Sequence, residues 1–429
     1  MMRIWTELRN STQLTNSLLL LLATGALAGF GFVFWTIVAH AYSSSTVGVA
    51  TTLLAVSSLV SLLGLAGFDT TLVRFLPGAQ NPQAHVRSSL TVVSVTSAVL
   101  SAGCVFILPA VSSSLSFVTH HWWYGASFVF FTVITSLNTL TNAIFLAHKK
   151  ALTILSINIL FGAAKVVLPL LWIHPSAMHI FLLAGISQLV GLLCSLAALW
   201  RQFGYKPTFG IDSAILKKVQ RYSFSVYISS LLNLLPPTLV PLIIVHSLRP
   251  DNAAYYYISF TIASVLYTIS YAAMQSAFAE GSHNEAAFSL HLRKAAKLIG
   301  VLLVPAMVIL FASSSFVLGF FGKDYAEQGR GILQLLTLSA LPVAAYSALG
   351  VIFKITRNLR GIIAMNTVYA LLILSISYVG LPSLGVSAIG WAWLAGNIGS
   401  IVTGLIFAKQ PKVNIVKEAL YGKIAATGE

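Results

Sequence analysis

Long apolar stretches, separated by short polar segments, run through almost the whole chain. A helix needs about 20 apolar residues to cross the hydrocarbon core of a bilayer. Twelve stretches reach that length, at roughly 16–39, 47–67, 88–110, 122–146, 151–173, 178–200, 222–247, 254–278, 297–321, 331–353, 361–380 and 385–408. The first is longer than a signal-peptide core and lacks a convincing cleavage site, so we expect it to be retained. The pattern predicts an all-α integral membrane protein with about twelve transmembrane helices.

The composition also indicates a membrane protein. Hydrophobic residues make up 57% of the 429 positions and charged residues only 8%, far fewer charges than in soluble domains. In a soluble protein, the net charge of +15 would suggest a nucleic-acid partner. Here the basic residues lie between apolar stretches, where they set orientation in the bilayer, so we expect no nucleic-acid partner.

Lysine and arginine are distributed unevenly between the two sides of the predicted membrane. When the N-terminus is placed in the cytoplasm and the loops alternate, Arg249, Lys323 and Arg330 fall outside and Lys165 falls within a span. The other 21 of the 25 basic residues fall inside, as the positive-inside rule requires. We therefore expect a multi-pass plasma-membrane protein with both termini in the cytoplasm.

The loops divide the spans into two sets of six. The longest internal loop, 201–221, is basic and would form a cytoplasmic linker between six-helix bundles at 16–200 and 222–408. A cytoplasmic N-terminus at 1–15 and a basic cytoplasmic tail at 409–429 complete the predicted organisation. Because six is even, both sets begin on the same side of the membrane, as in transporters built from parallel repeats.

One basic residue, Lys165, lies within the apolar segment 153–172, with no acidic residue near it in the sequence. A charge inside the membrane costs a few kcal/mol and usually faces an interior cavity, where it serves the function. The alternative is a lysine that snorkels to the interface or bonds to backbone carbonyls. Asn158 and Gly162 share its helix face, and the glycine would leave room beside the lysine. We expect Lys165 to bind an anionic substrate.

Two other spans carry polar residues on a single helix face. These residues, three or four positions apart, are Thr135, Asn138 and Asn142 in one span and Ser264, Tyr267, Tyr271 and Gln275 in the other. Such side chains either hydrogen-bond between helices and hold a bundle together or contact a substrate. The candidate substrate-binding residues beside Lys165 are therefore Asn138, Asn142, Asn158, Tyr267, Tyr271 and Gln275.

Acidic residues avoid the middle of every predicted span. Asp69 and Glu280, at the cytoplasmic ends of spans, are the nearest to the membrane interior and are the candidate gate or coupling residues. A shift of 206 residues aligns the two halves and places Arg74 opposite Glu280, which suggests opposite charges at one gate. A proton or sodium site usually uses a buried carboxylate, so coupling to an ion stays open.

The sequence contains no motif for nucleotide or metal chemistry. A P-loop is absent and no His, Asp or Glu cluster has metal-ligand spacing, so we expect no cofactor, no metal and no catalytic residue. His120 and His121 precede Trp122 and Trp123 in a short loop predicted to lie outside. This arrangement is typical of an interfacial aromatic belt and not of a site.

Two segments, GFVFWTIVAHAYSSSTVG at 31–48 and LAGFDTTLVRFLPG at 65–78, carry a family resemblance. They resemble the polysaccharide-transporter branch of the multidrug/oligosaccharidyl-lipid/polysaccharide (MOP) exporter superfamily, which includes Wzx-type oligosaccharide flippases. The second segment matches the family pattern G-F/L-x-x-x-L-x-R-F/Y-x-P through Gly67, Phe68, Leu72, Arg74, Phe75 and Pro77. FAEGSH at 278–283 resembles the family's short motif after the eighth span.

The resemblance implies two six-helix bundles around a central cavity that opens alternately to each side of the membrane. It implies an oligosaccharide on a polyprenyl (pyro)phosphate carrier as the substrate, moved from the cytoplasmic to the outer leaflet for surface polysaccharide or glycan biosynthesis. Partners would be the lipid bilayer and glycan polymerase or assembly proteins. Lys165 would suit the pyrophosphate headgroup, and Arg74 would make the first contact with it near the cytoplasmic mouth.

Three other functions remain as alternatives. A multidrug and toxin extrusion (MATE) exporter of the same superfamily usually carries buried acids that bind cations, whereas this chain has a buried base. A membrane glycosyltransferase or polymerase generally needs catalytic acids or bases on sizeable outer loops. The predicted outer loops are short, and only Asp251, Asp324 and Glu327 could serve there. A non-transporting scaffold would leave Lys165 hard to explain.

Overall fold

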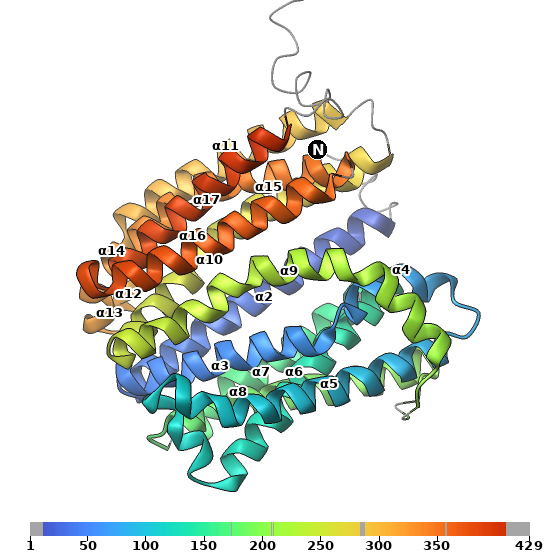
Figure 1. The fold of residues 1–429 in the computed structure, drawn as a ribbon, viewed down its shortest axis with the longest axis horizontal. Coiled ribbons are helices and arrows are strands. Elements are labelled where there is room, and N and C mark those ends of the chain that lie inside the picture. The colour runs from blue at the N-terminus through green and yellow to red at the C-terminus, as the bar shows by residue number, and fades with distance from the viewer. Residues whose placement is uncertain are drawn as a thin grey trace, which may run out of the picture. The chain divides into compact units, whose positions relative to one another are not determined.

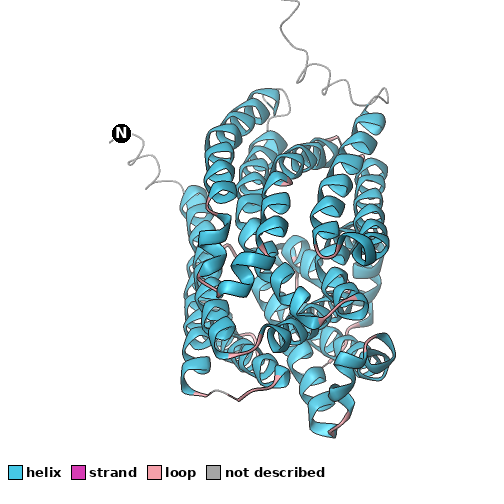
Figure 2. Cartoon of the chain, turned by 90° about the vertical axis from the view of Figure 1, so that its left-hand side faces the viewer, coloured by secondary structure: helices cyan, strands magenta, loops and turns pink. Residues whose placement is uncertain are grey.

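The computed structural model of the protein describes residues 12–172, 174–206, 208, 210–283, 288–356 and 358–408. Within these ranges the chain is helical and contains no strand (Figure 2). Figure 1 labels most of the helices, which are α2 (Thr12–Ala41), α3 (Ser44–Leu65), α4 (Phe68–Phe75), η1 (Leu76–Gly78), α5 (Pro82–Val111), η2 (Ser113–Thr119), α6 (Trp122–Ala147), α7 (Ala151–Leu171), α8 (Ala177–Phe203), α9 (Ser213–Ser247), α10 (Pro250–His283), α11 (Phe288–Ala312), α12 (Ser314–Gly319), α13 (Lys323–Gln328), α14 (Arg330–Leu338), α15 (Ala340–Ile355), α16 (Leu359–Leu384) and α17 (Ser387–Ala408).

Twelve of the described helical segments are long and apolar enough to cross a membrane, which confirms the predicted all-α membrane architecture. They follow the predicted spans in order, but some ends differ. α5 begins at Pro82, six residues before the predicted span, because the Asn81 side chain accepts a hydrogen bond from the Ala84 N–H. An asparagine cap followed by proline is a strong start signal for a helix. Hydropathy does not register that signal, so it placed the start too late.

Serines interrupt two of the predicted spans. α11 ends at Ala312 instead of continuing to 321, and the Ser313 hydroxyl donates to the Ile309 carbonyl (2.7 Å). The predicted span 331–353 is divided between α14 and α15 at Ser339, whose hydroxyl donates to the Leu335 carbonyl (3.0 Å). A serine that bonds back to its own helix competes with regular backbone pairing and favours a bend or an end.

Internal packing divides the chain into two compact units, Met1–Tyr227 (unit 1) and Ile228–Glu429 (unit 2). The division lies inside α9. The hydroxyl of Tyr227 donates to the Leu63 carbonyl of α3 within unit 1 (3.1 Å). The segment 201–221, which we predicted as a linker, contains the end of α8, a loop and the start of α9.

The helices of unit 1 alternate in direction, so its loops gather at two ends. At one end, called the η2 end, lie the α2–α3 turn, η2 and the loop before α8, where Tyr42 and His179 share a hydrogen bond of 2.8 Å. At the other, called the α4 end, lie α4, the α6–α7 turn and the loop after α8. There the Gln83 side chain donates to the Lys206 carbonyl (2.9 Å).

A row of hydroxyl groups joins α3, α5 and α6 in the core of unit 1. Ser57 of α3 shares a hydrogen bond of 2.8 Å with Thr132 of α6. One turn further on, Ser136 of α6 accepts from Ser97 of α5 (2.8 Å) and donates to Ser61 of α3 (3.0 Å). All five side chains are buried, and we call them the hydroxyl seam. Small polar side chains of this kind let membrane helices approach closely while satisfying one another.

Unit 2 is built around buried aromatic residues. Trp393 of α17 is only 1% exposed, and the rings of Phe260 and Tyr256 of α10 are centred 5.1 and 6.2 Å from it. α10 packs on α11, α14 and α15, while α16 pairs with α17. The last two helices approach closely at Gly396, where a Cβ atom would lie 2.4 Å from the side chain of Ile373.

Candidate functional site

Lys165 lies on the face of α7 that packs against α2 in unit 1. Its ammonium nitrogen is 4.7 Å from the centre of the Phe34 ring of α2 and 5.9 Å from that of Phe161. The side chain is half-buried, and among the described residues it has neither an acidic partner nor a hydrogen bond. A cation above aromatic faces is only partly compensated, so it retains the capacity to attract an anion.

Lys165 does not lie at the centre of its span. Six residues separate it from Leu171, the last residue of α7, which corresponds to about 9 Å along a helix. Asn158 lies seven residues after Ala151, the first residue of α7, and is buried, with no hydrogen bond to another described residue. Lys165 is therefore displaced from the middle of α7 toward the η2 end of unit 1, and Asn158 by a similar amount toward the α4 end.

The expected role of Gly162 was wrong. We expected this glycine to leave room beside the lysine, but a Cβ atom there would lie 2.2 Å from the ring of Phe30. The space is therefore filled by an aromatic side chain of α2. Gly162 lets α2 and α7 pack closely, and this packing brings Phe34 next to Lys165.

The two asparagines of α6 have different surroundings. The amide nitrogen of Asn138 donates to the backbone carbonyl (2.7 Å) and side-chain oxygen (2.8 Å) of Gln188 in α8, so this residue ties two helices together. The side-chain oxygen of Asn142 is buried and has no hydrogen-bond partner among the described residues. An unsatisfied buried carbonyl is costly, which makes Asn142 the better candidate of the two for contact with a ligand.

Asp69 and Arg74 lie on α4, a short helix at the α4 end of unit 1. The chain turns into α4 through Ala66 and Gly67, which both have positive φ (46° and 80°). Burial raises the pKa of the Asp69 carboxyl above its usual value, although backbone N–H groups oppose this in part. Arg74 is exposed, with its guanidinium carbon 5.5 Å from the centre of the Phe75 ring.

The predicted pairing of Arg74 with Glu280 stays a prediction. Glu280 belongs to the last turns of α10, where the side chains of 279–283 lie outside the described residues. The structure therefore gives no position for its carboxylate.

The predicted polar face of α10 in unit 2 divides into a buried and an exposed part. Tyr267 is buried, and its hydroxyl donates to the Leu336 carbonyl of α14 (2.8 Å). Tyr271 is 43% exposed, and Gln275 is also exposed. Tyr267 thus holds two helices together, whereas Tyr271 and Gln275 remain accessible for binding.

Sequence reasoning missed a polar chain in unit 2 that joins three helices. The hydroxyl of Tyr346 (α15) accepts from the Asn233 amide of α9 (2.7 Å) and donates to the side-chain oxygen of Asn366 in α16. Its ring stacks on that of Tyr369, with centres 5.6 Å apart. Each residue looked like an isolated polar group in an apolar span. Only the two mid-span asparagines could have signalled the chain.

The chemistry that these residues support is the binding of a ligand. The described residues include no group of three His, Cys, Asp or Glu side chains that could hold a metal. The one ion pair of described residues, Arg249 with Asp251 (3.5 Å), lies at a loop. What remains are a partly compensated cation, free amide groups and accessible aromatic hydroxyls, which suit a ligand that carries negative charge and hydroxyl groups.

Comparisons with known proteins agree with this fold. A lipid II flippase, MurJ, in an inward closed conformation superposes with a TM-score of 0.72 at 13% identity, covering 94% of this chain and 90% of that one. An inward-facing MATE multidrug resistance transporter of the MOP superfamily gives 0.70 at 14% identity, covering 91% and 95%. A MOP superfamily transporter from Pyrococcus furiosus superposes with a TM-score of 0.63 at 13% identity, covering 96% of this chain and 97% of that one. At these identities the likeness shows the fold alone.

The search of curated proteins found no match. The sequence profile of a family described as "Polysaccharide biosynthesis protein" matches residues 15–329, most of the chain. The structural neighbours are membrane transporters and flippases, not enzymes. This multi-pass membrane protein therefore belongs to the polysaccharide biosynthesis protein family and has the fold of the MOP transporters.

Proposed function

We propose that the protein is a flippase that moves an oligosaccharide linked to a polyprenyl (pyro)phosphate from the cytoplasmic to the outer leaflet by alternating access. The observation that carries this proposal is Lys165. Inside unit 1 it has aromatic neighbours and no described acidic partner, so an anionic headgroup would complete its surroundings. The family match to polysaccharide biosynthesis supports a glycan as the remainder of the substrate.

The remaining candidate residues would assist the passage of the substrate. Asn158 and Asn142, with amide groups left available in unit 1, would bind oxygen atoms of the headgroup or first sugar. Tyr271 and Gln275 would offer hydroxyl and amide contacts from unit 2. Asn138 and Tyr267, already engaged between helices, would position their neighbours.

The decisive experiment compares lipid transport and dye transport in reconstituted vesicles. The substrates are a pyrophosphate-linked glycolipid and a cationic dye, and the proteins are the wild type, Lys165→Ala and Lys165→Arg. We expect glycolipid movement in the wild type, none in Lys165→Ala and partial movement in Lys165→Arg. Lys323→Ala is the matched control because Lys323 is exposed and precedes a span.

The alternative function is export of a small molecule or drug, which the likeness to MATE transporters keeps open. Dye efflux without glycolipid movement would favour that alternative. Glycolipid movement at the wild-type rate in Lys165→Ala would refute the role of the lysine.

We also propose that both termini face the cytoplasm in the plasma membrane. In that orientation the η2 end of unit 1 is outside and the α4 end inside. Thr119 and Lys206 are exposed residues of the two ends and suit cysteine labelling after replacement of Cys104 and Cys194. In intact cells, an impermeant maleimide should label Thr119→Cys but not Lys206→Cys. The reverse labelling would invert the topology.

A further inference from the structure

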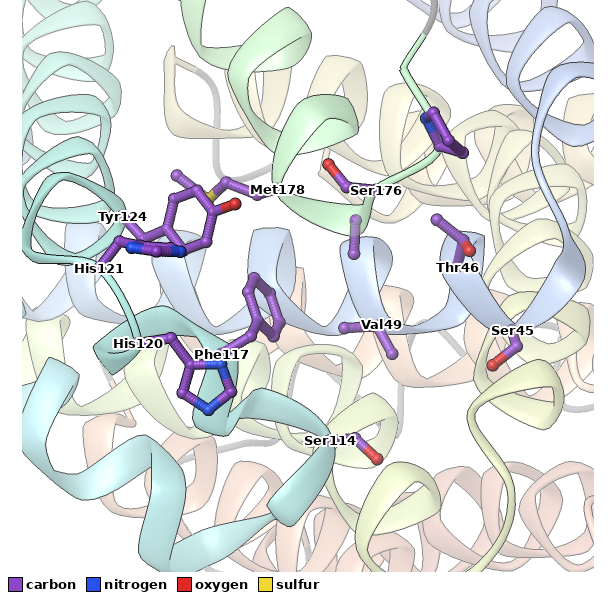
Figure 3. A pocket seen from close by; sticks show the side chains of 12 residues that line it. Ser45, Thr46, Val49, Ser114, Phe117, His120, His121, Tyr124, Ser176 and Met178 are labelled. Carbon is purple, nitrogen blue, oxygen red and sulfur yellow. The ribbon is translucent and has the colours of Figure 1, made fainter.

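A cavity of about 410 Å³ opens at the η2 end of unit 1 (Figure 3). It lies between the start of α3, the η2 segment with the turn that follows it, and the loop leading into α8. In Figure 3 the ring of Phe117 stands in the middle of the group, with Tyr124 and His121 on one side and Thr46 on the other. Small-molecule sites typically have volumes of about 300 to 1,000 Å³, so the cavity has the size of a binding pocket.

The wall of the pocket is aromatic on one side. The rings of Phe117 and Tyr124 meet edge to face with centres 6.1 Å apart, and His121 meets Tyr124 in the same way at 5.2 Å. These contacts hold the ring of Tyr124 between two neighbours, so its orientation is fixed before a ligand arrives. Fixed aromatic rings offer a flat apolar surface with polar tips, which suits a ligand that has both a C–H face and hydroxyl groups.

Several polar groups of the pocket have no hydrogen-bond partner among the described residues, although the Thr46 hydroxyl is bonded to that of Ser43 (2.9 Å). The rings of His120 and His121 are exposed, and neither makes a hydrogen bond to another described residue. The hydroxyls of Ser45 and Ser114 likewise have no described partner. The hydroxyl of Ser176 accepts from the backbone of α8, so its own proton remains available for donation. The pocket therefore presents both donors and acceptors.

The lining residues include no Asp, Glu, Lys or Arg. This distinguishes the pocket from the surroundings of Lys165, where a fixed positive charge would select an anion. A neutral ligand rich in hydroxyl groups fits the pocket best, because it can satisfy imidazole and hydroxyl partners without leaving a charge unpaired.

The pocket also lies beside residues that favour a membrane surface. Trp122 and Trp123, which directly follow the two histidines, are 84% and 41% exposed. Exposed tryptophans at the end of a membrane helix typically lie at the level of the lipid headgroups. A ligand in the pocket would therefore lie at the level where the sugars of a lipid-linked glycan leave the bilayer.

We propose that this pocket binds one or two neutral pyranose residues, with the C–H face of a sugar ring on Phe117 and Tyr124 and its hydroxyls bonded to His120 and His121. The inference rests on the proposed function for the source of the sugar, which would be the glycan of the transported lipid. It adds a second recognition site, for the glycan, to the headgroup site at Lys165.

Direct binding is the first test. The probes are the methyl glycosides of glucose, N-acetylglucosamine and rhamnose, with inorganic phosphate as competitor, measured by saturation-transfer NMR on the protein in lipid nanodiscs. We expect at least one glycoside to bind the wild type about tenfold more tightly than His120→Ala/His121→Ala, a difference of about 1.4 kcal/mol. Phe117→Ala should weaken binding similarly. His85→Ala, at the α4 end, and Phe106→Ala, an exposed residue of α5, are the matched controls.

The outcomes that would overturn the inference are definite. Failure of all three glycosides to bind the wild type, or equal binding by the pocket variants, would exclude a sugar site. Displacement of the glycoside by phosphate would show an anion site instead. Tyr124→Phe keeps the ring that the sugar face would contact, so its unfolding temperature and its affinity should both stay close to those of the wild type, and a tenfold loss of affinity would contradict stacking on the ring.

A transport measurement separates this inference from the proposed function. Vesicles would receive the polyprenyl pyrophosphate carrier with and without its glycan. We expect His120→Ala/His121→Ala to slow the glycan-bearing carrier several-fold and to leave the bare carrier unaffected. If the wild type moves neither lipid, the flippase proposal fails, and the glycoside binding experiment alone decides whether the pocket binds a sugar. If the wild type moves the glycolipid and the pocket variants move it equally fast, the pocket inference fails.

Discussion

The ammonium nitrogen of Lys165 lies 4.7 Å from the centre of the Phe34 ring, and Phe34 is fully buried. A cation–π contact contributes about 0.5 to 2 kcal/mol. A lysine inside a membrane helix costs about 2.5 to 3.5 kcal/mol on insertion scales. The aromatic neighbours therefore offset only part of the cost of this charge.

Replacing Lys165 by methionine should consequently raise stability while removing function. Methionine fills a similar volume without a charge, so Lys165→Met should unfold at the same or a higher temperature than the wild type and transport no glycolipid. Thermal unfolding in detergent and export from vesicles measure the two effects. A variant that is clearly less stable than the wild type would indicate a structural lysine.

The close approach of α2 and α7 should depend on the absence of a side chain at Gly162. Gly162→Ala would force its Cβ against Phe30, and overpacking of this kind typically costs about 1 to 3 kcal/mol. Gly103→Ala is the control, because a Cβ there meets nothing within 4 Å. We expect a lower unfolding temperature for the first variant and an equal or higher one for the second. Equal unfolding temperatures for the two variants would show that α2 can move away from α7 without loss of stability.

The Asn233–Tyr346–Asn366 chain should contribute measurably to the stability of unit 2. Tyr346→Phe keeps the ring on Tyr369 but removes the hydroxyl that serves both asparagines. Hydrogen bonds between membrane helices contribute about 0.6 kcal/mol on average and up to about 1.7. We expect Tyr346→Phe to lower the free energy of unfolding by an amount toward the upper value, because one hydroxyl serves two hydrogen bonds. Tyr378→Phe is the control, since Tyr378 is 59% exposed on α16, and it should change little.

Neutralising Asp69 should affect stability in a pH-dependent way. Burial raises the pKa of this carboxyl, so the folded state holds its proton more tightly than the unfolded state does. Stability attributable to Asp69 therefore falls as pH rises through the raised pKa and stays low above it. At pH 7, Asp69→Asn should be at least as stable as the wild type, and this advantage should shrink on acidification toward pH 3.8. A wild type that is more stable than the variant at pH 7 would contradict this.

His148 should have the opposite pH dependence. Its ring stacks on Phe203 at 4.2 Å, and burial followed by the charge of Lys150 lowers its pKa below 6.5. The folded state then binds a proton less readily than the unfolded state, so stability is lost as pH falls from 6.5 through the lowered pKa. His148→Phe keeps an aromatic ring but cannot titrate. When the pH is lowered from 7.5 to 5, the unfolding temperature should fall more for the wild type than for this variant.

The fold could be predicted from the sequence because the membrane limits the choices. A stretch of some 20 apolar residues can only be a helix there, and this rule found every span in order. It could not find the divisions at Ser313 and Ser339, because a serine inside an apolar run changes the hydropathy little. The start at Pro82 was readable from Asn81, but only as a capping signal and not from hydropathy.

The candidate site was less accessible to sequence reasoning. Lys165 stood out because a charge in an apolar span is costly wherever the helix packs. The partners of Tyr346 and the ring beside Gly162 depend on which helices meet, and the sequence does not state this. His120 and His121 were interpreted as part of an aromatic belt. The pocket that they share with Phe117 needs two further segments of unit 1 to form its walls.

The hydroxyl seam of unit 1 has a consequence for motion. Each Ser or Thr hydroxyl both donates and accepts, and it rotates freely about its Cβ–O bond. When two helices slide by a small step, such a group can exchange one partner for the next without leaving a charge stranded in the interior. Ion pairs at the same positions would resist such a movement, because separating two buried charges costs much more free energy. The hydroxyl seam instead offers exchangeable hydrogen bonds, so we expect α3, α5 and α6 to shift past one another at low cost in free energy. Its members are Ser57, Ser61, Ser97, Thr132 and Ser136.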